Sequence, residues 1–210
     1  MKKLHIAIAS TTSKPGAVAD NLRQIAKFAE QAGRDGADLL LTPEMSASGY
    51  GPYPEILKTA EVAGRGKIYE KLAKSAEKND VAICADSGIE KLDDYLFENK
   101  VRLLLVPTGA GGKREERVSS DELRTEAGRK RYSEWLEKVF FPGRQSIEDC
   151  IKYRRALAAV NLCGYDGKKH YHIGHGMIIT RMGEAPALFH GLPNLDRQRP
   201  MYAHAVVDFG

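Results

Sequence analysis

Apolar residues recur along the first part of the chain in a pattern that predicts a strand, a helix and a second strand. Residues 4–9 and 39–41 are short apolar runs, typical of buried strands. Between them, residues 18–33 carry apolar side chains at the three- and four-residue spacing of an amphipathic helix. Because the connections are short, we expect a βαβ unit with a parallel strand pair and a right-handed crossover.

The rest of the chain continues in alternation and then changes character. The pattern predicts helices at 66–78, 89–98 and 146–155, and strands at 81–84, 101–106, 156–162, 177–180 and 202–209. Residues 164–176 have the composition of a loop. Helix-separated strands followed by strands without helices predict an α/β fold with a mixed sheet. We expect a single domain over residues 1–210, with a charged insertion at about 111–145.

The second strand ends at a proline that is followed directly by a carboxylate. The segment 38–44 reads Asp-Leu-Leu-Leu-Thr-Pro-Glu, and residues 102–108 repeat it as Arg-Leu-Leu-Leu-Val-Pro-Thr. Pro43 should end a buried strand and place Glu44 at its carboxyl end, where ligands gather in sheets flanked by helices. Glu44 is therefore a candidate general base, and a helix-capping or loop acid is the alternative.

Composition narrows the class of protein. Among 210 residues the net charge is +4, and its basic excess comes largely from residues 113–155, which does not indicate a nucleic-acid partner. No apolar run approaches the ~18 residues of a membrane span, and the start lacks the features of a signal peptide. Three cysteines without metal-type pairing suit a reducing compartment, so we expect a cytoplasmic protein.

Cys84 ends the short strand 81–84, just before the helix predicted at 89–98. A thiol close to a helix N-terminus has its pKa lowered by the helix dipole, which makes Cys84 a candidate nucleophile and Glu44 its candidate base. The alternative is a buried packing residue, since cysteine is among the most buried residue types. Cys150 and Cys163 lack this placement and are interpreted as packing residues.

Other polar clusters carry weaker signals. His170, His172 and His175 have no neighbouring carboxylate or cysteine in a ligand pattern, so surface histidines are favoured over a metal site. The glycines at 109–112 are not followed by the Lys-Ser/Thr of a phosphate loop. We therefore expect neither metal nor cofactor. Tyr50, Tyr53 and Trp135 are candidates for a pocket wall, and core packing explains them equally well.

Several of these segments together resemble the nitrilase superfamily of carbon–nitrogen hydrolases. Residues 39–50, Leu-Leu-Leu-Thr-Pro-Glu-Met-Ser-Ala-Ser-Gly-Tyr, resemble the family block that carries the catalytic glutamate, which maps to Glu44. Ile-Cys-Ala-Asp-Ser-Gly at 83–88 resembles its nucleophile elbow, which maps the nucleophile to Cys84. Residues 103–108, 156–161, 174–179 and 202–208 resemble later strands of the family. The resemblance implies an αββα sandwich with a mixed sheet.

The resemblance also has a gap. In the family, strands and a lysine-bearing loop lie between the second helix and the nucleophile, whereas here that helix and the strand 81–84 adjoin. No lysine therefore matches the family's oxyanion-stabilising lysine, and Lys113 is a remote substitute. The fold is shortened by an internal gap that leaves a sheet edge needing oligomerisation or a cover, for which residues 113–141 are a candidate.

Two functions follow. The first is a hydrolase of amide or nitrile carbon–nitrogen bonds, with Cys84 as nucleophile, Glu44 as base, the Ala85 amide as oxyanion donor and Tyr50 at the substrate. The second is a degenerate, non-catalytic binding or assembly protein. In the first case the partner is a small-molecule amide or nitrile, with no nucleic acid and no membrane. The resemblance further implies a homodimer or higher homo-oligomer.

Overall fold

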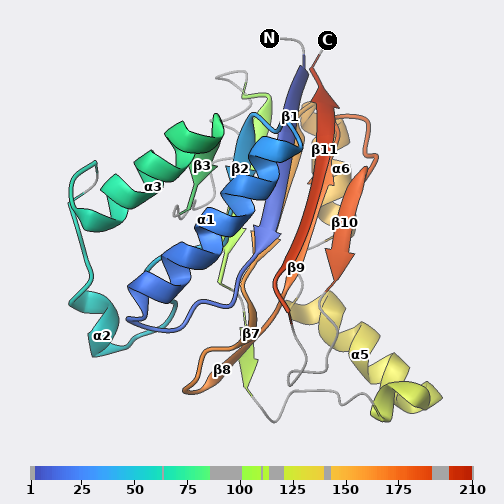
Figure 1. The fold of residues 1–210 in the computed structure, drawn as a ribbon. Coiled ribbons are helices and arrows are strands. Elements are labelled where there is room, and N and C mark those ends of the chain that lie inside the picture. The colour runs from blue at the N-terminus through green and yellow to red at the C-terminus, as the bar shows by residue number, and fades with distance from the viewer. Residues whose placement is uncertain are drawn as a thin grey trace.

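The computed structural model describes residues 3–62, 64–85, 101–109, 111–113, 121–139, 143–190 and 199–209. The helices are α1 (Val18–Arg34), α2 (Pro54–Leu57), α3 (Lys67–Asn79), the 3-10 helix η2 (Glu122–Arg124), α5 (Glu126–Val139) and α6 (Gly143–Tyr153). The strands are β1 (Lys3–Ser10), β2 (Leu39–Leu41), β3 (Ala82–Cys84), β4 (Leu103–Thr108), β5 (Gly111–Lys113), β6 (Ala156–Asn161), β7 (Cys163–Tyr165), β8 (His170–Ile173), β9 (His175–Ile179), β10 (Ala187–His190) and β11 (Met201–Asp208). Figure 1 shows their arrangement, with both chain ends at one end of the molecule.

Two four-stranded sheets stack face to face. Sheet A has the strand order β11-β1-β2-β3, and sheet B has the order β10-β9-β6-β4. Each sheet is mixed: β1, β2 and β3 are parallel, as are β4 and β6, while β11, β9 and β10 pair antiparallel. A third, antiparallel sheet of β5, β8 and β7 lies at one end of the sandwich.

Alternation along the strands builds the layers. On β1, Ile6 and Ile8 enter the core between the sheets, whereas Ala7 and Ala9 pack toward α1. On β6, alternate residues pack toward the other sheet or toward α6. Complete burial of an isoleucine side chain stabilises the fold by about 1.5–3 kcal/mol, so this inter-sheet core is a major source of stability.

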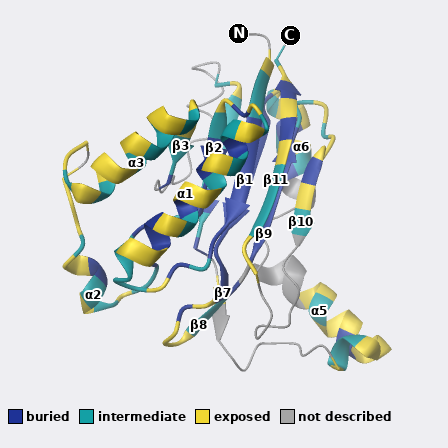
Figure 2. Cartoon of the chain, viewed as in Figure 1, coloured by how far each residue is buried: buried dark blue, intermediate teal, exposed yellow. Residues whose placement is uncertain are grey.

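Helices cover both outer faces of the sandwich. Helices α1 and α3 lie over sheet A, and α6 lies on the far side, over sheet B (Figure 1). In Figure 2 the central strands are mostly buried, and the outer faces of α1 and α3 are exposed. The predicted αββα sandwich with mixed sheets is therefore confirmed.

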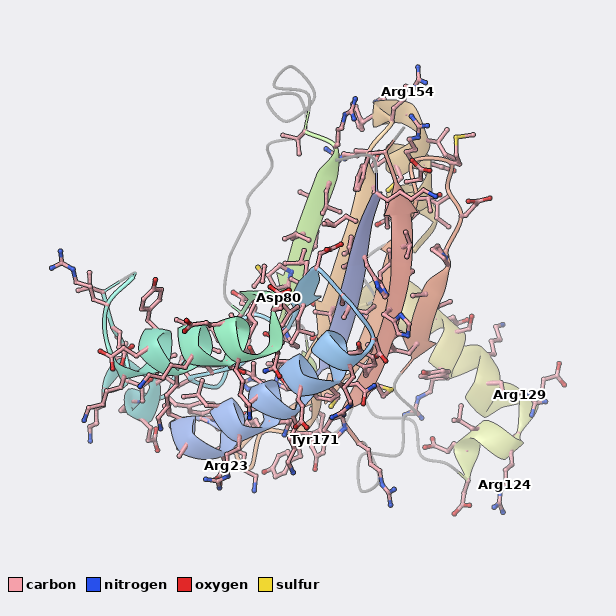
Figure 3. The ribbon with its side chains drawn as sticks, turned by 45° about the horizontal axis from the view of Figure 1, so that its top comes forward. Arg23, Asp80, Arg124, Arg129, Arg154 and Tyr171 are labelled. Carbon is pink, nitrogen blue, oxygen red and sulfur yellow. The ribbon has the colours of Figure 1, made fainter. Side chains whose placement is uncertain are left out.

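Helix α3 behaves as its sequence predicts. Its four lysines, Lys67, Lys71, Lys74 and Lys78, are all exposed. Ile68 and Leu72 pack partly buried beside α1. The helix ends at Asp80, which is in the left-handed conformation with φ of 51° (Figure 3), a common way to end a helix.

Several sequence-based expectations are wrong. Residues 164–176 are not a loop, because β7 and β8 form a hairpin there and β9 begins at His175. Strand β10 was not predicted, being only four residues long. Pro107 does not end its strand but lies inside β4. Within the described residues β4 pairs only with β6, and a strand with one free edge tolerates a residue that cannot donate a backbone hydrogen bond.

The strand order also shows which described strands stand at the edges of the sheets, where an open edge was expected. Within the described residues, β3 pairs only with β2 and stands at the end of sheet A, while β4 stands at the end of sheet B. The helix predicted at 89–98 lies outside the described residues. In the described part of the chain, no helix is long and apolar enough to cross a membrane.

Candidate active site

Glu44 lies just beyond β2, in a loop held by buried polar contacts. Its side chain is half-buried, and Oε2 accepts a hydrogen bond from the backbone amide of Gly109 at 3.2 Å. Gly109 directly follows β4, so the carboxylate bridges the ends of two strands that belong to different sheets. The repeated segments 38–44 and 102–108 therefore end side by side.

Tyr50 lies next to this carboxylate. Burial raises the pKa of its phenol, and the negative charge of Glu44 raises it further. Gly109 leaves no room for a side chain, because a Cβ there would lie 2.2 Å from Cδ2 of the Tyr50 ring. A neutral phenol beside a carboxylate can orient a polar ligand; a contact of Tyr50 with substrate stays a prediction.

His172 also belongs to this region, and sequence reasoning missed it. It lies on β8, its ring meets the Tyr50 ring edge-on with centroids 5.7 Å apart, and only 2% of its surface is exposed. Tyr50 thus has Glu44, Gly109 and His172 as neighbours. The alternation of residues along β8 would have indicated a buried histidine, had residues 170–173 been recognised as a strand.

The expectation of surface histidines is wrong for two of the three. His172 and His175 are buried, and His170 is half-buried at the hairpin turn, where its Nδ1 lies 3.2 Å from the hydroxyl of Tyr53. In the described residues, no group of three or more His, Cys, Asp and Glu is placed to hold a metal ion. Tyr53 donates a hydrogen bond to the buried carboxylate of Asp166 at 2.8 Å, so it serves to hold the hairpin.

Cys84 is the last residue of β3. It is aligned with Leu41 in the parallel pairing of β3 with β2, and its carbonyl accepts a hydrogen bond from the Thr42 amide at 2.9 Å. Its half-buried side chain packs against the core between the sheets. The carboxylate of Glu44 also faces sheet B, so both candidate side chains lie on the same side of sheet A.

The other two cysteines are buried packing residues, as predicted. Burial raises the pKa of the Cys150 thiol to about 11 and has the same effect on Cys163. Cys150 contacts the core under α6, and Cys163 lies at the start of β7. All three cysteines are described, and none forms a disulfide.

Ala85, the expected oxyanion donor, directly follows Cys84 and is buried. Its carbonyl accepts a hydrogen bond from the hydroxyl of Ser46 at 3.2 Å. The helix expected to lower the pKa of Cys84 lies outside the described residues. Lys113 lies on β5 opposite His170, but its side chain, like that of Trp135, lies outside what is described.

A groove of about 710 Å³ lies on the side of sheet A that faces α1 and α3, opposite to the side on which Glu44 and Cys84 face sheet B. Met45, Ile83, Ala85 and residues of α3 line it, together with the segment 56–62. Ile83 packs toward α1 and α3, in contrast to Cys84, which faces the inter-sheet core. The groove therefore adjoins the backbone of the candidate site but not its reactive side chains.

Comparison of the sequence with known proteins gives a family match and one relative. Residues 5–171 match the family model described as carbon-nitrogen hydrolase. A stretch of 73 residues, 35% of this chain, is 41% identical to a glutamine-dependent NAD(+) synthetase from Synechocystis sp.. That stretch spans only 12% of the synthetase.

Solved structures with the same fold are distant in sequence. A variant of the amidase from Nesterenkonia sp. AN1, with the acetamide moiety of fluoroacetamide added covalently at its active-site cysteine, superposes with a TM-score of 0.66 at 15% identity. The match covers 99% of this chain and 91% of the amidase. A CN-hydrolase superfamily protein from Xanthomonas campestris, with an arsenic adduct in its active site, gives a TM-score of 0.62 at 14% identity over 97% of this chain and 91% of that protein. The family model and the fold lead to one conclusion: the chain belongs to the carbon–nitrogen hydrolase family, within the nitrilase superfamily.

Proposed function

We propose that this protein hydrolyses the carbon–nitrogen bond of small amides, or of nitriles, with Cys84 as nucleophile and Glu44 as general base. One observation carries the proposal: Glu44 lies beyond the carboxyl end of β2, Cys84 is the last residue of the neighbouring parallel strand β3, and both side chains face sheet B. A nucleophile and a base at such strand ends are held by rigid elements, as an activated thiol requires.

The mechanism we propose proceeds in two steps. The carboxylate of Glu44 takes the Cys84 thiol proton, and the thiolate attacks the amide carbonyl carbon. The carbon–nitrogen bond then breaks, and Glu44 returns the proton to the leaving nitrogen, which releases ammonia or an amine. In the second step Glu44 takes a proton from water, the hydroxide attacks the thioester, and Cys84 leaves as the thiol after Glu44 returns that proton.

Two further groups serve this mechanism. The backbone amide of Ala85 donates to the oxyanion of each tetrahedral intermediate, a contribution typically worth about 2.7–4 kcal/mol. Tyr50, with its pKa raised by burial and by Glu44, stays a neutral donor at physiological pH and orients the polar end of the substrate. No lysine is assigned to the oxyanion.

The decisive experiment combines turnover with covalent trapping. Ammonia release from acetamide, propionamide and the matching nitriles is measured for the parent protein, and fluoroacetamide adducts are located by mass spectrometry. Cys84→Ala should abolish both signals. Glu44→Gln should remove turnover while the fold persists, since glutamine is nearly isosteric and its side-chain oxygen can accept from the Gly109 amide. Turnover that persists in Cys84→Ala would rule out this mechanism.

One observation favours the second function, a non-catalytic binding or assembly protein. The pairing register aligns Cys84 with Leu41, three residues before Glu44, and the Cys84 side chain packs against the inter-sheet core. In this alternative the Cys84 thiol serves packing rather than attack. Absence of both turnover and fluoroacetamide adducts in a folded parent protein would support this alternative.

We also propose an oligomeric state and a cellular compartment for the protein. We propose a homodimer or higher homo-oligomer, which light scattering during size-exclusion chromatography would test. Three cysteines without a disulfide suit the reducing cytoplasm, and fractionation of cells would locate the protein there.

A further inference from the structure

Four buried hydroxyl side chains connect the ends of β1, β2 and β3. They are Thr11, Ser13, Thr42 and Ser46, and none is more than 5% exposed. Thr11 and Ser13 are hydrogen-bonded to each other at 3.0 Å, and Ser13 donates to the carbonyl of Ser46 at 2.8 Å. Buried polar groups in a satisfied network fix one local geometry, so this network holds the loop that carries Glu44.

The network continues to the backbone beside Cys84. The hydroxyls of Thr42 and Ser46 are 2.8 Å apart, and Ser46 donates to the carbonyl of Ala85 at 3.2 Å. The Cys84 carbonyl accepts from the Thr42 amide at 2.9 Å, and the Thr42 hydroxyl lies 3.3 Å from the same oxygen. Thr42 thus holds the Cys84 carbonyl through its backbone amide, and its one hydroxyl proton is shared between that oxygen and the hydroxyl of Ser46, which holds the Ala85 carbonyl.

These contacts determine the direction of the Ala85 amide. In a planar trans peptide the C=O and N–H bonds point in opposite directions. Since the Cys84 carbonyl points to Thr42 on the β2 side, the N–H of Ala85 in the same peptide unit points away from β2. Ser46 holds the carbonyl of Ala85, which lies beyond the end of the β2–β3 ladder at Cys84.

We propose that Thr42 and Ser46 are positioning residues of the hydrolase site, which clamp the carbonyls of Cys84 and Ala85 and so aim the Ala85 amide at the oxyanion. The proposal rests on the proposed function for its catalytic consequence. Neither side chain touches substrate in this role. A displacement of about 1 Å in such a donor can cost as much as ~100-fold in rate, so loss of one hydroxyl should be felt at the chemical step.

The hydrogen bonds themselves can be tested without turnover. The carbonyl ¹³C resonance of Ala85 should move upfield in Ser46→Ala, because that carbonyl loses its hydroxyl donor. The carbonyl of Cys84 should move upfield by less in Thr42→Val, because it loses only the longer contact to the hydroxyl and keeps the Thr42 amide as donor. Ser48→Ala is the matched control in the same loop, since Ser48 donates only to Gly49 at 3.4 Å among the described hydrogen bonds. Unchanged carbonyl shifts in both variants would overturn the clamp, whatever the protein's activity.

The catalytic consequence is tested with kcat and KM measured separately. Thr42→Val keeps the shape of the side chain and removes its hydroxyl, whereas Thr42→Ser keeps the hydroxyl. We expect Thr42→Val and Ser46→Ala to lower kcat by about 10- to 100-fold with KM within about threefold, and Thr42→Ser to retain at least about a third of the parental kcat.

The outcomes separate this proposal from the proposed function. A parental kcat in Thr42→Val would overturn the positioning role, and a rise in KM alone would do the same. If the parent protein neither hydrolyses amides nor traps fluoroacetamide, the proposed function fails, and the carbonyl shifts still decide whether the clamp exists. If Thr42→Val fails to fold, Ser46→Ala and its carbonyl shift decide the question.

Discussion

The carboxylate of Glu44 accepts a hydrogen bond from the amide of Gly109 and thereby joins the ends of β2 and β4, which belong to different sheets. The contact depends on the absence of a side chain at residue 109, where a Cβ would lie 2.2 Å from the Tyr50 ring. One glycine thus permits two features: the close approach of Tyr50 and an amide directed at the carboxylate. The orientation of the proposed base therefore depends on packing from the opposite sheet.

The first prediction concerns this glycine. Gly109→Ala should displace the Tyr50 ring, shift the amide away from Glu44 and lower kcat at least about tenfold, at a cost of about 1–3 kcal/mol in unfolding free energy. Steady-state kinetics and urea unfolding would measure the two effects. Gly167→Ala is the control: a Cβ there meets no atom within 4 Å, but its φ of 85° still strains alanine. If Gly109→Ala lost stability but kept the parental kcat, as Gly167→Ala should, the Gly109 contact would have no catalytic role.

The second prediction concerns the three thiols. Burial raises the pKa of Cys150 and Cys163 to about 11, so at pH 7.5 fewer than about one in a thousand of these groups is a thiolate. Cys84 is only half-buried. Native protein treated with iodoacetamide at pH 7.5 should therefore gain one adduct, at Cys84, as mass spectrometry of the digest would show.

A control and a pH series sharpen this test. Cys84→Ala should remain unmodified under the same conditions until it is unfolded. If Glu44 and Cys84 are coupled as proposed, the midpoint of the Cys84 alkylation rate should lie below ~8.5 and move in Glu44→Gln. Rapid labelling of Cys150 in the folded protein would contradict the burial on which the prediction rests.

The sequence predicts much of the sandwich because its regular segments have clear periods. Strand β1 follows from its apolar run and helix α1 from its helical spacing, and the position of Glu44 beyond β2 follows from Pro43. The β7–β8 hairpin could not be predicted, because Gly164, Gly167 and Gly174 flank polar residues, and its strands form only through pairing with each other and with β5.

The candidate site, too, could be predicted only in part from the sequence. Local sequence identifies Glu44 and Cys84 as candidates, since each follows a short apolar strand. It does not show that Gly109 and His172 meet Tyr50, because those contacts depend on how two sheets and a hairpin pack. The buried hydrogen bonds of Thr42 and Ser46 could not be predicted for the same reason: the partner of Ser46, Ala85, lies about forty residues away in sequence.

The third prediction concerns stability in alkaline solution. Burial and the hydrogen bond to Asp166 raise the pKa of Tyr53 to about 12. Between pH 10 and 12 the unfolded state loses the phenol proton while the folded state keeps it, so rising pH favours unfolding. This contribution to stability should be complete below about pH 10 and lost as the pH approaches 12. Urea unfolding at a series of pH values would give the slope, which should be smaller in Tyr53→Phe; an unchanged slope would assign the alkaline loss to other tyrosines.

The fourth prediction concerns acid stability and the end of the chain. Hydrogen bonds from Gln31 and Tyr202 lower the pKa of Asp35, and the nearby imidazole of His204 acts in the same direction. Tyr202 donates to Asp35 Oδ2 at 2.8 Å, which ties β11 to the end of α1. Since the folded state holds the proton less tightly than the unfolded state, this contribution is present above the unfolded pKa of ~3.9 and is lost as the pH falls through the lower folded value.

The measurement follows from that sign. Unfolding free energies of the parent and of Asp35→Asn, taken from pH 6 to pH 2.5, should converge as the pH falls, because protonation removes in the parent what the substitution removes at every pH. Tyr202→Phe, which deletes one of the two donors, should give an intermediate curve. Asp20→Asn is the control on the same helix, since Asp20 is exposed and pairs only with Arg23 among the described contacts, and exposed pairs contribute little. If the two curves of unfolding free energy against pH stayed parallel, protonation of Asp35 would not contribute to the loss of stability in acid.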